Sequence, residues 1–263
     1  MKKAILILVT LMMATMIATS VTAATVTISG PAQVWDSPLR GDWTNANIGQ
    51  NGGDRQWRLL TGASGRHNLM KFDLSGIPVG ATINSAVMGI YIRRYGNPGD
   101  TTGYQISRLQ EGMSWVEGTN AYADPAFAGD VTWNSRVQGS ALWQVAGATG
   151  AADIDLNTSI SWDFAGNAAE GFVNFNLKGF VQDWVSNSWE NNGILFWGGS
   201  GGDDGNNYNW AYLSEASGTT EMTRVPYLMV DYTPAVVTPE PSSLAALGMF
   251  GLGALGFIKR RSA

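Results

Sequence analysis

The chain lacks cysteine and contains a single histidine, His67. No disulfide can therefore stabilise it, and a histidine-assisted nucleophile would have to use that one residue. Because His67 follows Arg66 at the start of an apolar stretch, we expect it at a strand edge, without a catalytic role. A pair of carboxylates of the glycosidase type stays open as an alternative, since the sequence does not give the separation of the acidic side chains.

Positive charge is also scarce. Between residues 24 and 238 there are 11 basic and 20 acidic residues, a net charge of −9. Up to Arg136 the two signs balance at nine each, and beyond it there are two basic and eleven acidic residues. This balance argues against a nucleic-acid partner, which needs a basic surface. It leaves a polyanion only a local patch in the first half of the chain.

Helix patterns are nearly absent from residues 24–233. Short apolar runs alternate there with clusters of glycine, asparagine, aspartate and proline, which is typical of strands joined by turns. The predicted strands span residues 25–28, 57–61, 68–72, 81–95, 104–109, 171–176, 194–197, 210–214 and 227–232. Only residues 177–185 carry apolar side chains at helical spacing. The pattern predicts one all-β domain at residues 24–233, a jelly-roll β-sandwich.

Long hydrophobic runs occur at the two ends of the chain. Near the start, Lys2 and Lys3 precede an apolar run at residues 4–17. Val21, Thr22 and Ala23 then supply the small residues expected before a secretory cleavage point. Residues 1–23 are therefore predicted to be a signal peptide that directs export, and the mature chain is expected to begin at residue 24 or 25.

A three-part pattern ends the chain. A linker at residues 234–238 leads to Pro239, Glu240 and Pro241, then to an apolar stretch at residues 244–258, and then to Lys259, Arg260 and Arg261. As a helix the apolar stretch would reach roughly 22 Å, against roughly 30 Å of bilayer hydrocarbon. It therefore predicts a single, marginal transmembrane helix with its basic end inside the cell. The two prolines keep the segment around Glu240 extended.

The order and spacing of these parts at residues 239–263 resemble the PEP-CTERM sorting signal of Gram-negative bacteria. The resemblance implies that a membrane-embedded exosortase recognises the tail and cleaves near the Pro-Glu-Pro motif. The inner membrane would hold the protein only transiently, before delivery to the cell surface or the extracellular matrix. An ordinary C-terminal membrane anchor is the alternative.

Five segments of the central region carry a second resemblance. They are NLMKFDLSGIPVGATINSAVMGIYI from Asn68, SWVEGT from Ser114, VTWN from Val131, VQDWVSNSWENNGILFW from Val181, and AYLSEAS to VPYLMVDY between Ala211 and Tyr232. In this order they resemble the DNRLRE domain family. The resemblance implies a jelly roll of the carbohydrate-binding-module type, as found in surface proteins and beside polysaccharide-degrading enzymes.

Tryptophan is abundant, with eleven residues in 263. An exposed indole offers a stacking surface to the apolar face of a sugar ring, and exposed indoles are expected in loops. The binding candidates in or beside polar loops are Trp43, Trp57, Trp189 and Trp210, with Arg55 and Arg58 near Trp57. Filling the core is the alternative for each of these tryptophans. A scaffold role is expected for Trp115, Trp133, Trp184 and Glu117, the last accepting hydrogen bonds from turn amides at Gly118.

A further binding candidate lies on the strand predicted at residues 81–95. Tyr91, Arg93 and Tyr95 share one face of this strand, while Ile90 and Ile92 take the other. An aromatic, cationic, aromatic row suits a sugar acid. The alternative is a solvated outer face on which Arg93 stacks against the tyrosines.

One calcium-like motif is present. Asp203 and Asp204 follow Gly-Gly-Ser-Gly-Gly, as at the start of the calcium-binding nonapeptide repeat. A single copy cannot build a stacked calcium roll. Ca²⁺ is therefore a weak candidate cofactor at these two aspartates, and a flexible turn is the alternative.

Together these features predict a non-catalytic, exported protein. Its expected partners are an exosortase, the inner membrane for a time, and a neutral or mildly anionic polysaccharide of the extracellular matrix. Two alternatives stay open: a structural matrix protein without a specific sugar site, and a polysaccharide-degrading enzyme.

Overall fold

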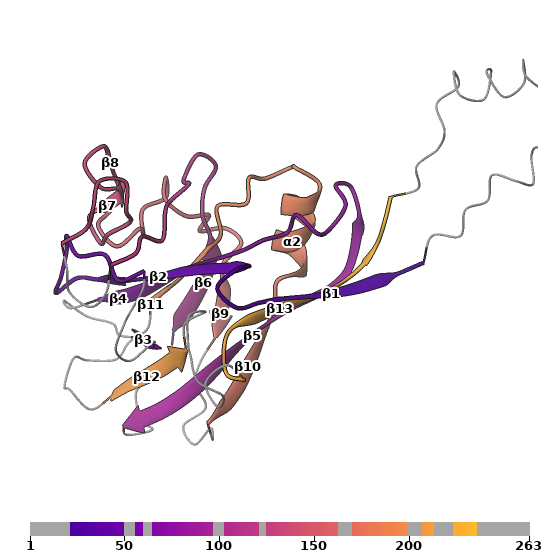
Figure 1. Cartoon of the computed structure of the whole chain (residues 1–263), viewed down its shortest axis with the longest axis horizontal. Helices are drawn as coiled ribbons and strands as arrows, with labels where there is room; N and C mark the ends of the chain where they lie inside the picture. Colours follow the sequence, from indigo (N-terminus) through magenta and orange to yellow (C-terminus); the bar gives the residue numbers. More distant parts are fainter. Residues whose placement is uncertain are drawn as a thin grey trace, which may run out of the picture. The chain divides into compact units, whose positions relative to one another are not determined.

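The computed structural model describes residues 22–49, 56–59, 65–96, 103–120, 125–162, 170–198, 207–212 and 223–235 (Figure 1). Its described residues are mostly strands and turns, with helix α2 (Lys178–Val185). Residues Ala23–Pro234 form one compact unit. The predicted all-β class is therefore confirmed. No helix among the described residues is long and apolar enough to cross a membrane. The predicted tail helix at residues 244–258 and nearly all of the predicted signal peptide lie outside them.

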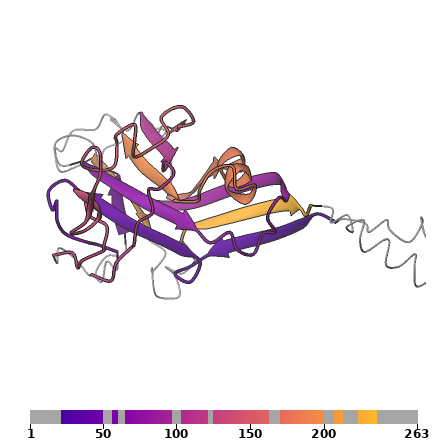
Figure 2. The ribbon, with the colours of Figure 1, turned by 90° about the horizontal axis from the view of Figure 1, so that it is seen from above.

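One antiparallel sheet has six strands. They are β1 (Ala24–Ser29), β13 (Tyr227–Thr233), β5 (Thr82–Gly96), β10 (Gly171–Asn176), β12 (Asn207–Tyr212) and β3 (Gln56–Leu59). The long strand β5 organises it. Because Ile92 pairs with both Gly171 of β10 and Ala211 of β12, these two strands flank β5 on opposite sides. The yellow strand β13 continues the sheet to the indigo strand β1, beside it in Figure 2.

A second antiparallel sheet has five strands. Its order is β2 (Val34–Arg40), β4 (Arg66–Phe72), β11 (Ile194–Gly198), β6 (Tyr104–Arg108) and β9 (Ile160–Trp162). The connection from β6 to β9 contains a small hairpin, β7 (Ser135–Val137) and β8 (Ala141–Leu142). In Figure 1 this hairpin lies on the side of β2 and β4 that is away from the six-stranded sheet.

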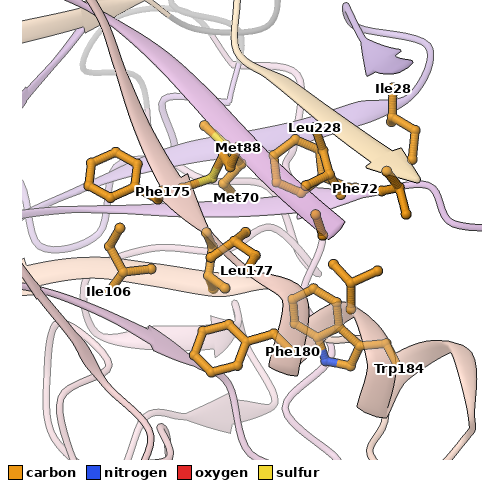
Figure 3. Close-up of a cluster of buried hydrophobic side chains, with 14 of the residues drawn as sticks. Ile28, Met70, Phe72, Met88, Ile106, Phe175, Leu177, Phe180, Trp184 and Leu228 are labelled. Carbon is orange, nitrogen blue, oxygen red and sulfur yellow. The ribbon is translucent and has the colours of Figure 1, made fainter. Parts of the chain in front are cut away.

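The main core lies between the two sheets. Met88, Phe175 and Leu228 come from the six-stranded sheet, while Met70, Phe72 and Ile106 come from the five-stranded sheet (Figure 3). Alternation produces this arrangement, since successive side chains of a strand point to opposite faces. Helix α2 adds Phe180, Val181, Trp184 and Val185 to the same core, which confirms the helix predicted at residues 177–185. The two sheets therefore form a sandwich.

A second core covers the outer face of the five-stranded sheet. Leu39, Leu69 and Leu195 point away from the main core and meet Val131, Trp143, Ala148 and Ile154 from the connection between β6 and β9. Both faces of this sheet are therefore buried, which explains why β4 and β11 are apolar on both sides. Trp133 and Trp115 pack against this second core and Trp184 against the main one, so each has the predicted scaffold contacts.

Strand β2 was not among the predicted strands, because Asp36 and Pro38 interrupt its apolar pattern. The structure places β2 at the edge of its sheet, where proline is tolerated. At this edge the N–H of Asp36 donates to Oε1 of Glu117 at 2.7 Å. The predicted hydrogen bonds from turn amides to Glu117 are thus replaced, at this oxygen, by a contact with a strand 81 residues earlier.

His67 is the second residue of its strand, close to the strand end where it was expected, but the strand lies in the interior of the sheet. His67 belongs to β4, which lies between β2 and β11 in the sheet order, and it pairs with Leu39. Its ring lies 4.8 Å from the ring of Trp133, centroid to centroid, and its Nδ1 lies 2.7 Å from the carbonyl oxygen of Gly147. Burial lowers the pKa of His67 to about 4, and the Gly147 contact opposes this only in part. The imidazole is therefore neutral at pH 7.

This burial makes stability depend on pH. Between about pH 6.5 and pH 4 the unfolded chain binds a proton at His67 while the folded chain does not. The free energy of unfolding should therefore fall by on the order of 3 kcal/mol across that window as the pH is lowered. Urea denaturation at a series of pH values measures this. His67→Gln, which cannot be protonated, should remove the contribution of His67 and leave only the slope of the carboxylates near pH 4; an unchanged slope in that variant would refute the assignment.

Candidate functional site

Three aromatic side chains meet on the outer face of the six-stranded sheet. Tyr91 of β5 lies edge-on to Phe172 of β10 at 5.3 Å, and Phe172 lies edge-on to Tyr227 of β13 at 5.2 Å. Their neighbours Ile90 and Leu228 are buried in the main core, so the aromatic residues point the other way. Phe172 is 40% exposed, and we call the three residues the aromatic platform.

A glycine permits this packing. Gly89 pairs with Tyr227, and a Cβ at Gly89 would stand 2.2 Å from Cε1 of the Tyr227 ring. The ring of Tyr227 therefore lies over the backbone of β5, in space that any other residue would occupy. The hydroxyl of Tyr227 donates to Oδ1 of Asn174 at 3.0 Å, which anchors the outer end of the ring to β10.

Charged and polar groups surround the platform. The guanidinium of Arg224 lies 4.9 Å from the ring centroid of Tyr91, within cation–π range. Asn174 adds an amide group on an exposed position of β10. The arrangement thus combines an apolar surface with hydrogen-bonding groups at its rim.

The strand register brings several predicted candidates close together in the same sheet. Trp210 of β12 pairs with Arg93 of β5 on one side and with Arg58 of β3 on the other. Tyr95 pairs with Tyr208, and Trp57 pairs with Ala211. Tyr91 is two positions from Arg93, so these candidates occupy neighbouring backbone positions next to the platform. Arg55, Asp203 and Asp204 lie outside the described residues.

Trp189 is not an exposed loop residue as predicted. Its Nε1 donates to the carbonyl oxygen of Leu109 at 2.9 Å, and the guanidinium of Arg108 lies 3.9 Å from its ring centroid. The polar segment Ser-Asn-Ser-Trp-Glu-Asn-Asn suggested exposure, but the indole packs against the main core. Trp43 is half-buried, with the guanidinium of Arg40 3.2 Å from its ring centroid. Trp43 follows β2 and Trp189 precedes β11, both strands of the five-stranded sheet, whereas the platform lies on the six-stranded sheet.

A cleft of about 460 Å³ opens elsewhere on the sandwich. Its walls are Trp35, Lys71, Trp115, Val116, Glu117, Gly118, Thr119 and Asp130. Trp35 and Lys71 are direct neighbours across β2 and β4. No binding candidate was predicted here, because β2 was not predicted and because Trp115 and Glu117 were assigned to the scaffold.

Phe172 and Tyr227 were also missed as site residues. The alternation of apolar residues could have indicated that both point outward, because Phe172 alternates with the inward-facing Val173 and Phe175, and Tyr227 precedes the buried Leu228. Their partnership with Tyr91 depends on pairings over long sequence separations, which the sequence does not specify. Among the described residues, no group of three or more histidine, aspartate or glutamate side chains could hold a metal ion.

Comparison with known families identifies a sorting motif at the end of the chain. Residues 237–262 match the PEP-CTERM protein-sorting motif, in agreement with the resemblance at residues 239–263. The motif indicates an exported protein that an exosortase sorts from a membrane-anchored precursor. No curated protein matches the chain. The resemblance of the central region to the DNRLRE domain family remains a prediction.

Proposed function

We propose that this protein is a non-catalytic component of the extracellular matrix that binds polysaccharide through the aromatic platform and the adjoining strands of the six-stranded sheet. In this proposal the sandwich has the jelly-roll winding of carbohydrate-binding modules. The observation that carries the proposal is the cluster of half-buried Tyr91 and Tyr227 around the exposed Phe172, held in place by Gly89 and Asn174.

The chemistry of the platform suits a sugar chain. Sugar rings have apolar C–H faces and polar edges, so they stack on aromatic side chains while nearby amides and charges bind their hydroxyl groups. The platform supplies rings from three strands, and Arg224 and Asn174 supply polar groups beside them. Arg93, Trp210 and Arg58 occupy paired backbone positions on β5, β12 and β3, which continue the sheet beside the platform.

The positive charge of three arginines in or beside the six-stranded sheet narrows the class of ligand. Arg58, Arg93 and Arg224 are three of the 11 basic residues between residues 24 and 238, and all three belong to or adjoin this sheet. The domain as a whole is acidic, so a highly charged polyanion is repelled at long range. A neutral or mildly anionic polysaccharide fits both facts.

Affinity electrophoresis tests this proposal. Residues 24–235 contain both cores, and we expect them to be retarded in gels that contain neutral or mildly anionic polysaccharides. Phe172→Ala combined with Tyr227→Ala should weaken binding by about tenfold or more, because each lost stacking contact contributes about 1 kcal/mol. Gly89→Ala should act in the same direction by displacing the Tyr227 ring without removing an aromatic residue.

The matched control is Phe127→Ala, because Phe127 is 63% exposed and lies in the connection between β6 and β9. This variant should bind like the unaltered chain. Circular dichroism of every variant verifies that the sandwich is folded. Absence of retardation on all polymers would refute the proposal and favour a structural matrix protein, and release of reducing ends from a polymer would indicate an enzyme.

A further inference from the structure

The cleft and the aromatic platform lie on opposite sides of the sandwich. Val34, Met70 and Phe72 of the five-stranded sheet face the main core. Trp35 and Lys71 stand between these positions on β2 and β4, so they point away from the six-stranded sheet. The platform points outward from the other sheet, and a ligand in the cleft therefore cannot touch it.

The walls of the cleft are held in place before any ligand binds. Nε1 of Trp115 donates to the carbonyl oxygen of Asn192 at 2.9 Å, and Oε1 of Glu117 accepts the N–H of Asp36. Oδ2 of Asp130 accepts the N–H of Phe127 at 3.0 Å. A site with fixed side chains binds its ligand without an added ordering cost.

The chemistry of the walls matches a sugar unit. Two indoles supply apolar faces, and the ammonium of Lys71 lies 6.0 Å from the ring centroid of Trp35. Glu117 and Asp130 add carboxylates that accept hydrogen bonds from hydroxyl groups, while Lys71 donates them. The volume of about 460 Å³ lies in the range of small-molecule sites, which is about 300–1,000 Å³.

The local charge favours a neutral sugar. Lys71 is the one basic residue among the described lining residues, against Glu117 and Asp130. A third carboxylate, that of Glu190, is near Lys71. Hydrogen bonds from the Gly112 N–H and Asn192, together with the charges of Lys71 and Arg136, hold the pKa of Glu190 below its usual value. An anionic sugar would therefore meet more negative than positive charge.

We propose that this cleft is a second binding site, which takes a neutral sugar unit, and that the domain thereby cross-links two polysaccharide chains. The cross-linking part rests on the function proposed for the aromatic platform, while binding in the cleft does not. Two sites that face opposite directions on one rigid sandwich favour a bridge between two chains over simultaneous contact with one short chain.

Isothermal titration calorimetry of residues 24–235 tests the cleft directly. The probes are cellohexaose and mannohexaose as neutral ligands and trigalacturonic acid as an anionic one. At least one neutral hexasaccharide should bind, and Trp35→Ala and Lys71→Met should each weaken its binding by about tenfold. Trp43→Ala is the matched control, because Trp43 is also a half-buried tryptophan next to a cation but lies outside the cleft.

The aromatic-platform variant Phe172→Ala with Tyr227→Ala separates the two proposals. If this variant is retained less strongly by polymers but binds the hexasaccharide like the unaltered domain, both proposals are supported; if its polymer retention is unchanged, the platform fails and the cleft stands. Failure of both neutral hexasaccharides to bind, tighter binding of trigalacturonic acid, or normal binding by Trp35→Ala would overturn the cleft proposal.

Viscometry of hydroxyethylcellulose and galactomannan solutions tests cross-linking. The unaltered domain should raise the viscosity of at least one polymer, and the effect should disappear in Trp35→Ala although that variant is still retained in affinity gels. Sedimentation of the domain alone verifies that it is monomeric, so that a dimer with one site in each copy is excluded. A full viscosity increase with Trp35→Ala would overturn cross-linking through the cleft.

Discussion

Replacement of Arg108 by methionine should lower the free energy of unfolding by about 3–5 kcal/mol. Arg108 is 7% exposed and lies between the rings of Trp189, at 3.9 Å, and Phe180, at 5.6 Å. Its Nε donates to Oδ2 of Asp155 at 3.0 Å, and its Nη1 donates to Asp183. Methionine keeps the packing volume but leaves the buried Asp155 without its cation.

Arg108 contacts Asp155 and Asp183, and these two ion pairs should contribute differently to the loss of stability. Burial by itself raises the pKa of Asp155, but hydrogen bonds from Thr158, the Asn157 N–H and Arg108 outweigh it and hold that pKa below its usual value. The Asp183 side chain is 42% exposed, so Asp183→Asn should cost only about 0–1 kcal/mol. Equal losses from Arg108→Met and Asp183→Asn in urea denaturation would contradict this assignment.

The effect of Arg108→Met should also depend on pH. In the unaltered chain Asp155 stabilises the fold above its unfolded pKa, near 3.8, and this contribution disappears as the pH falls through the lower, folded pKa. Without Arg108 the folded pKa of Asp155 rises, and protonation then removes the buried charge. The difference in stability between the two chains should therefore shrink below about pH 4.

The strands with regular apolar patterns were predictable. Strands β4, β5, β6, β10, β11 and β13 fall within two residues of their predicted bounds, because each buries at least one face and so shows alternation or a continuous apolar run. Strand β2 was not predictable. It contains Pro38, which is tolerated because β2 is an edge strand, and its buried Asp36 depends on contacts remote in sequence. Local sequence carries no information about such contacts.

The candidate site was predictable only in its parts. The alternation of Ile90, Tyr91 and Ile92 correctly placed Tyr91 opposite the buried isoleucines. The contacts of Phe172 with Tyr91 and with Tyr227 require three strands to pair in one register. Tyr91 and Tyr227 are 136 residues apart in the sequence. The cleft requires the loop at residues 115–119 to fold over the edge strand β2, which the sequence does not specify.

Sorting and the proposed polysaccharide binding belong to different parts of the chain. All residues of both cores lie within Ala23–Pro234, whereas the sorting motif matches residues 237–262. Changes in the tail should therefore alter the destination of the protein without altering the stability of the sandwich. This separation makes the tail testable by its location in the cell alone.

Replacement of Pro239 and Pro241 by alanine should leave the protein as an uncut, membrane-bound precursor. Proline cannot continue a helix, so the two prolines are predicted to hold Glu240 in an extended backbone that a protease can bind. Alanine is the strongest helix former and would allow the helix predicted at residues 244–258 to extend through the motif. A helical backbone cannot enter a cleavage site that takes an extended chain.

Cell fractionation with mass spectrometry measures the outcome in the producing bacterium. The unaltered chain should appear outside the cell without its tail, whereas the double variant should remain in the membrane fraction with residues 259–261 intact. Pro234→Ala is the matched control, because it removes a nearby proline that precedes the matched motif. Normal release of the double variant would contradict a role for the Pro-Glu-Pro motif in processing. Retention of both variants would point instead to a general requirement for a stiff linker before the membrane.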